Sequence, residues 1–121
     1  KHISPNVEEL NLSKQYFEDE NVKNMLSRCN KIKVLTLEAT PITNDSLKMI
    51  RQCLNLTLEE LTLAYYGEFH LCLLELKTMS RLKILNLYNR YKNCPNKKTE
   101  DKKVQDLRQQ LPHLMIRTFF D

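Results

Sequence analysis

A short aliphatic pattern recurs four times along the chain. Each copy reads aliphatic-x-x-Leu-x-Leu, and the copies are Val7–Leu12, Ile32–Leu37, Leu58–Leu63 and Leu82–Leu87. Their first residues, at positions 7, 32, 58 and 82, are 25, 26 and 24 residues apart. Self-similarity at such a period is typical of repeat architectures, in which each unit holds one strand and one helix. The pattern therefore predicts stacked copies of a single strand-helix unit.

The Leu-x-Leu part of each copy predicts a strand with one buried face. Alternate side chains of a strand point to opposite faces, so the two leucines face inward and the residue between them faces outward. We expect parallel strands, with Leu10, Leu35, Leu61 and Leu85 side by side. Because each unit buries its leucines against its neighbours, stability should depend on contacts between adjacent units.

Between the strands, the apolar spacing changes to that of a helix. In the first unit the apolar residues lie at i, i+3, i+4 and i+7, after an acidic residue, Glu18 or Asp19, that can begin a helix. In the second unit Thr43–Asp45 suits a helix cap. The apolar stripes of the three units are Val22, Met25, Leu26 and Cys29; Ile42, Leu47, Ile50 and Leu54; and Cys72, Leu76 and Met79.

The last unit departs from the others. The polar segment 91–101 contains Pro95 and predicts a surface loop, followed by a helix over 101–111. Two registers are open for the final strand, one led by Leu111–Ile116 and one by Leu114–Phe119. We favour the second, with Pro112 marking the turn, and expect Phe119 and Phe120 to cover the end of the core.

The stretch from Leu35 to Cys53, LTLEATPITNDSLKMIRQC, resembles the cysteine-containing leucine-rich repeats of F-box proteins, and Leu111-Pro-His-Leu114 resembles the way such domains end. The resemblance covers essentially the whole chain. It implies an α/β fold, a right-handed leucine-rich-repeat solenoid shaped as a horseshoe arc, with parallel strands on the concave face and helices on the convex face. Residues 1–121 would form one domain of about four to five repeats, which we expect to be a piece of a larger protein.

The resemblance also implies a function. In F-box proteins such repeats recognise a substrate protein, while a separate F-box segment docks to a cullin ubiquitin-ligase adaptor, and this predicts a cytoplasmic or nuclear ligase subunit. No F-box is visible in this chain. Two alternatives stay open: a structural assembly subunit of a mitochondrial respiratory or ATP synthase complex, and an extracellular recognition domain. Sequence upstream, a transit peptide or an F-box, would distinguish the first two.

The outward positions of the strands are the predicted binding surface for a protein partner, because solenoids usually bind on their concave side. Aromatic and apolar members among them suit a protein interface. The predicted site residues are Asn11, Ser13, Val34, Thr36, Glu38, Glu60, Thr62, Tyr65, Ile84, Asn86 and Tyr88, with Glu9 and Ala64 in the same rows.

Composition and charge exclude several other classes. Hydrophobic residues make up 41% and charged residues 28%, which argues against disorder, and no apolar run approaches the length of a membrane span. The net charge of +4 is too small and too dispersed to favour nucleic acid. The four cysteines form no C-x-x-C pair, so we expect reduced thiols, although Asn11, Asn44 and Asn55 begin glycosylation-type sequons.

Catalytic motifs are missing from the sequence. The histidines at 2, 70 and 113 occupy unlike positions in different units, with no nucleophile motif near them. Gly67 is the single glycine, so neither a phosphate-binding loop nor a dinucleotide fingerprint is possible. We predict a binding module that is not an enzyme and that needs no metal or cofactor.

Overall fold

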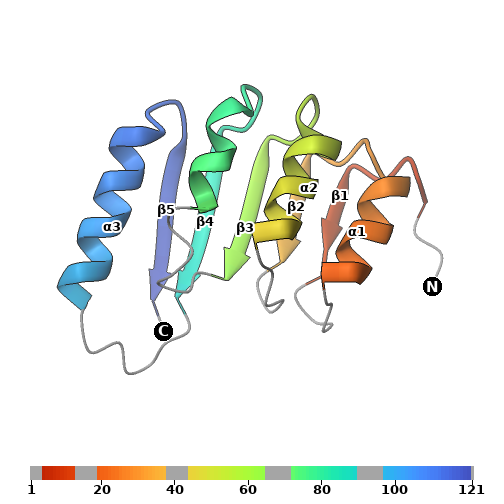
Figure 1. Cartoon of the computed structure of the whole chain (residues 1–121). Helices are drawn as coiled ribbons and strands as arrows, with labels where there is room; N and C mark the ends of the chain where they lie inside the picture. Colours follow the sequence, from red (N-terminus) through yellow and green to blue (C-terminus); the bar gives the residue numbers. More distant parts are fainter. Residues whose placement is uncertain (1–3, 13–18, 38–43, 65–71, 90–96, 121) are drawn as a thin grey trace.

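The computed structural model describes residues 4–12, 19–37, 44–64, 72–89 and 97–120. Five strands form one parallel sheet, and their order in space, β1-β2-β3-β4-β5, is their order in the sequence (Figure 1). The elements are β1 (Glu9–Asn11), α1 (Asp19–Arg28), β2 (Val34–Leu37), α2 (Asn44–Leu54), β3 (Glu60–Ala64), the 3-10 helix η2 (Cys72–Thr78), β4 (Ile84–Asn89), α3 (Lys97–Gln110) and β5 (Met115–Phe120).

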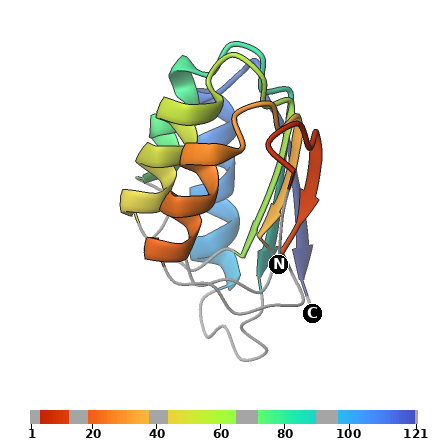
Figure 2. The same cartoon turned by 90° about the vertical axis from the view of Figure 1, so that its right-hand side faces the viewer.

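The four helices of the described residues lie on one face of the sheet, as Figure 2 shows in side view. Each helix follows one strand and precedes the next, so the chain returns along the same face before every new strand. The α/β class and the parallel sheet are thereby confirmed. On the opposite face no helix or strand of the described residues covers the sheet.

A ladder of aliphatic side chains joins the sheet to the helices. Leu10 pairs with Leu35, Leu35 with Leu61, Leu61 with Leu85, and Leu85 with Ile116, as the repeat predicts for the first four. Leu35, Leu61 and Leu85 have no exposed surface, whereas Leu10 in the first strand is half-buried. A second ladder, Leu37, Leu63 and Leu87, is also buried. Side chains of α1, α2, η2 and α3 close over these ladders in one continuous core.

Charged residues alternate in sign where the strands begin. The main-chain N–H of Lys33 donates to Glu8 O at 2.6 Å, that of Glu59 to Lys33 O at 2.8 Å, and that of Lys83 to Glu59 O at 2.8 Å. The Lys33 ammonium also lies 3.0 Å from the Glu8 carboxylate, and this contact raises the pKa of Lys33 above its usual value. Opposite charges on neighbouring strands favour this register over a shifted one.

The third helix differs from the prediction. It is a 3-10 helix of seven residues, and the side chains it contributes to the core, with the residue just after it, are Leu73, Leu76 and Met79. Their spacing of three residues matches the three residues per turn of a 3-10 helix. Leu76 and Met79 of the predicted stripe are confirmed as buried, whereas Leu73 was missed because the prediction assumed the α-helical period. The side chain of Cys72 lies outside those that the structure describes.

The last unit also corrects the prediction. α3 begins at Lys97, so residues 97–100 are helical and not part of a loop. In β5, Leu114 and Ile116 face the core, while Met115, Arg117 and Phe119 are exposed. The favoured register was wrong, because it would have placed Arg117 and Phe119 in the core. The other register placed Leu114 and Ile116 inward correctly but aligned them two residues away from their observed partners in β4. Phe119 is exposed and does not cover the core, and the side chain of Phe120 lies outside those described.

The edge strand β5 is tied to α3 through a side chain. Met115 N–H donates to the carbonyl oxygen of Lys83, the residue just before β4, at 2.8 Å, so the main-chain groups of the next residue, Ile116, face away from β4. The Arg108 guanidinium donates from Nη2 to Ile116 O at 3.0 Å. An outward carbonyl of the sheet edge is thus satisfied from the helix layer.

The buried ladder predicts a sharp contrast between two neighbouring positions on adjacent strands. Leu61→Asp should abolish cooperative unfolding. Truncating such a leucine alone costs about 2–5 kcal/mol, and burying a carboxylate in its place adds to that cost. The free energy of unfolding of a typical domain is only about 5–15 kcal/mol. Thr36→Asp on the outer face should change the free energy of unfolding by less than about 1 kcal/mol. Urea unfolding followed by circular dichroism measures both, and equal losses would show that the in/out assignment is wrong.

Candidate protein-binding face

The outer face of the sheet, opposite the helices, carries the predicted site in two aligned rows. The first row is Glu9, Val34, Glu60 and Ile84, and the second is Asn11, Thr36, Thr62 and Asn86, each residue lying opposite its neighbour in the adjacent strand. Tyr88 follows in β4, opposite Ala64. The structure thus brings together eight of the eleven predicted site residues on one face. The other three, Ser13, Glu38 and Tyr65, lie outside the described residues.

The strand β5 adds three residues that the sequence analysis did not assign to this face. Met115 lies opposite Ile84, Arg117 opposite Asn86, and Phe119 opposite Tyr88. They were missed because of the wrong strand register. The alternation of Leu114 and Ile116 with polar or exposed neighbours was the signal that could have found them.

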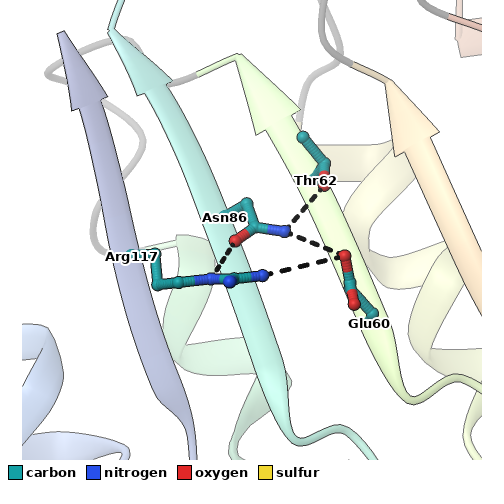
Figure 3. Close-up of polar contacts among 4 residues, drawn as sticks. All are labelled: Glu60, Thr62, Asn86 and Arg117. Carbon is teal, nitrogen blue, oxygen red and sulfur yellow. Dashed lines mark hydrogen bonds and ion pairs between the residues drawn. The ribbon is translucent and has the colours of Figure 1, made fainter.

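A polar network crosses three strands at the centre of the outer face (Figure 3). The Asn86 amide donates from Nδ2 to Thr62 Oγ1 at 3.0 Å and to Glu60 Oε2 at 3.2 Å, while Arg117 Nε donates to Asn86 Oδ1 at 2.8 Å. Arg117 Nη2 lies 3.9 Å from Glu60 Oε2, which is an ion-pair distance. We call Glu60, Thr62, Asn86 and Arg117 the outer network.

The outer network explains why two outward polar residues are buried. Thr62 is 6% exposed and Asn86 is 5% exposed, although neither faces the core. Asn86 uses both amide protons as donors and its carbonyl oxygen as an acceptor, so its desolvation is compensated. The amide is held from both sides and fixes the position of the Arg117 guanidinium.

Apolar side chains lie on either side of the outer network. The rings of Tyr88 and Phe119 stack with centroids 4.5 Å apart and planes 12° apart. On the other side Met115, which is 61% exposed, lies opposite the half-buried Ile84. The face therefore combines a fixed polar centre with exposed apolar and aromatic margins, a combination that protein interfaces use.

A second surface feature lies on the helix side. Arg51 in α2 and Leu74, Glu75, Lys77 and Thr78 around η2 line a cavity of about 260 Å³. Arg51 Nε lies 3.1 Å from Glu75 Oε2, within ion-pair range though without hydrogen-bond geometry. Arg51 and Glu75, two of the three charged residues on its wall, are thus already matched to each other, and the cavity is a weaker candidate than the outer face.

Two cysteine side chains, those of Cys29 and Cys53, are described, and they do not form a reactive site. Cys29 and Cys53 are free thiols. Cys29 is buried and its Sγ lies 3.6 Å from Ser4 O, which suits an S–H donor. Burial raises the pKa of the Cys53 thiol, which keeps it in the less nucleophilic protonated form. Both side chains therefore act as packing groups.

The described residues offer neither a metal-binding cluster nor a membrane-spanning helix. There, His, Cys, Asp and Glu form no group of three or more that could bind a metal ion. None of the described helices is long and apolar enough to span a membrane. No family model, curated protein or solved structure matches the chain at a significant level.

The outer network predicts a measurable coupling between two side chains. Asn86→Ala and Arg117→Ala should each destabilise the fold, Asn86→Ala by about 1–3 kcal/mol because it leaves the buried Thr62 hydroxyl and the half-buried Glu60 carboxylate without this donor. The double variant should lose less than the sum, with a coupling of about 0.5–3 kcal/mol. Urea titrations of the four proteins give this value, with the exposed Asn24→Ala in α1 as the control; strict additivity would contradict the network.

Proposed function

We propose that this chain is a protein-interaction module, and not an enzyme, that holds a partner protein against the outer face of its sheet. The observation that carries the proposal is the mixed surface on β3, β4 and β5: a hydrogen-bonded polar centre between Ile84 with Met115 and Tyr88 with Phe119. Strands hold these side chains in place, so little ordering is needed when a partner binds.

The uncovered face supports the proposal on general grounds. Parallel sheets occur almost always with both faces covered, because the crossovers place helices on each side. Here the helices lie on one side, and the other side exposes Met115 and Phe119, two of the three exposed large hydrophobic residues among those described. A surface of this kind is usually completed by another molecule.

The repeat architecture is part of the same proposal. Units of 24 to 26 residues, each adding one strand beside the previous one, support a leucine-rich-repeat solenoid whose strands line the concave side. Within that class, the resemblance of Leu35–Cys53 favours the F-box type. The partner would then be a ubiquitin-ligase substrate in the cytoplasm or nucleus, and a cullin adaptor would bind an F-box elsewhere in the protein.

Site-specific photo-cross-linking tests whether the outer face binds a partner. A benzoylphenylalanine at Thr36 on the outer face should give cross-links to a protein from lysate of the source cells, whereas the same group at Lys48 on α2 should not. Adding Ile84→Asp to the Thr36 probe should lower the yield at least about tenfold, because a desolvated carboxylate opposes binding. Cross-links from Lys48 alone, or a yield insensitive to Ile84→Asp, would contradict the proposal.

The F-box component has its own test. Affinity purification of the full-length protein should recover a cullin-ligase adaptor, and the same experiment on residues 1–121 should not. If the full-length protein brings down no adaptor, the ligase assignment is wrong, while the interaction module itself is judged by the cross-linking experiment.

A further inference from the structure

The outer network leaves part of one cation available. Among the described contacts, Arg117 uses Nε for its hydrogen bond to Asn86 and places Nη2 3.9 Å from Glu60, beyond hydrogen-bond length. No described contact uses Nη1. The side chain of Arg117 is 46% exposed. The N–H groups of Nη1 and Nη2 can therefore bind a carboxylate with two parallel hydrogen bonds.

The arrangement around Arg117 repeats across two strands. Met115, Arg117 and Phe119 are alternate residues of β5, so they share one face at intervals of about 6.6–6.8 Å. Ile84, Asn86 and Tyr88 lie opposite them in β4. The result is an apolar pair, a cationic centre and an aromatic pair in a line along the strands.

We propose that this line binds an extended segment of the partner with the pattern apolar-x-Asp/Glu-x-apolar, its carboxylate on Arg117. The proposal rests on the proposed function and specifies the chemistry of the partner. Alternate side chains of an extended peptide have the spacing of Met115, Arg117 and Phe119, so the acidic residue and its two apolar neighbours reach all three at once.

Glu60 does not prevent this binding. Its Oε2 accepts a hydrogen bond from Asn86 and lies 3.9 Å from Arg117 Nη2, beyond hydrogen-bond length, so it leaves the N–H groups of Nη1 and Nη2 able to donate to a second carboxylate. One guanidinium has five N–H donors and can serve two carboxylates on different edges. Asn86, by fixing Nε, also removes much of the orientational freedom that Arg117 would otherwise lose on binding.

A random 12-residue peptide library displayed on phage, selected on the full chain, tests the pattern. Enriched peptides should carry Asp or Glu with apolar residues two positions to either side.

Arg117→Gln should weaken the binding of these peptides at least about tenfold, because the charge is lost while the Gln amide can still donate to Asn86. Arg28→Gln on α1 is the matched control and should have no effect, and Asp→Asn in the peptide should reproduce the Arg117→Gln loss. Binding should also weaken with added salt for wild type and become nearly salt-independent for Arg117→Gln.

The outcomes separate this inference from the proposed function. Peptides without an acidic residue that bind Arg117→Gln as well as wild type, yet are lost on Ile84→Asp, overturn the acidic pattern and leave the binding face intact. Peptides insensitive to both substitutions, or a selection that enriches none, also overturn it, and the cross-linking from position 36 then decides independently whether the face binds a partner. Circular dichroism of each variant confirms that the fold is retained.

Discussion

The packing of one aliphatic side chain beside the next across the sheet determines the rest of this structure. Leu35, Leu61 and Leu85 have no contact with solvent, and each lies directly opposite the next. A shift of one residue in any strand would exchange its two faces and expose these leucines. The ladder therefore fixes the register, and the register in turn fixes which residues form the outer face.

The outer network is a consequence of that register and not of any local motif. Glu60, Thr62, Asn86 and Arg117 come from three strands and are up to 57 residues apart, from position 60 to position 117. Two of them are nearly inaccessible to water even though no described helix or strand covers that face of the sheet. Because the polar groups of this cluster hydrogen-bond to one another, their side chains are held in one arrangement, which is a property expected of a recognition surface.

The sequence predicted the part of the fold in which a repeated pattern carries the information. Four copies of Leu-x-Leu placed β1 to β4 and their outward rows correctly, because alternation in a strand is a strict geometric rule. The fifth strand has no such copy, since Ile116 and Thr118 occupy the two leucine positions. The outer network could not be predicted without that strand, because the partner of Asn86 Oδ1 is on β5. η2 was predicted with the α-helical period and is a 3-10 helix. Over seven residues, apolar side chains spaced every three residues and every three to four residues form nearly the same pattern.

The contact between Arg108 and Ile116 has a consequence for how this molecule behaves at high concentration. An uncapped outer strand offers a row of hydrogen-bonding groups on which a second molecule can add its own strand, and such additions can continue into aggregates. An incoming strand would have to displace the guanidinium from Ile116 O before it could pair there. One side chain from the helix layer thus occupies a hydrogen-bonding position on β5 that strand addition would need.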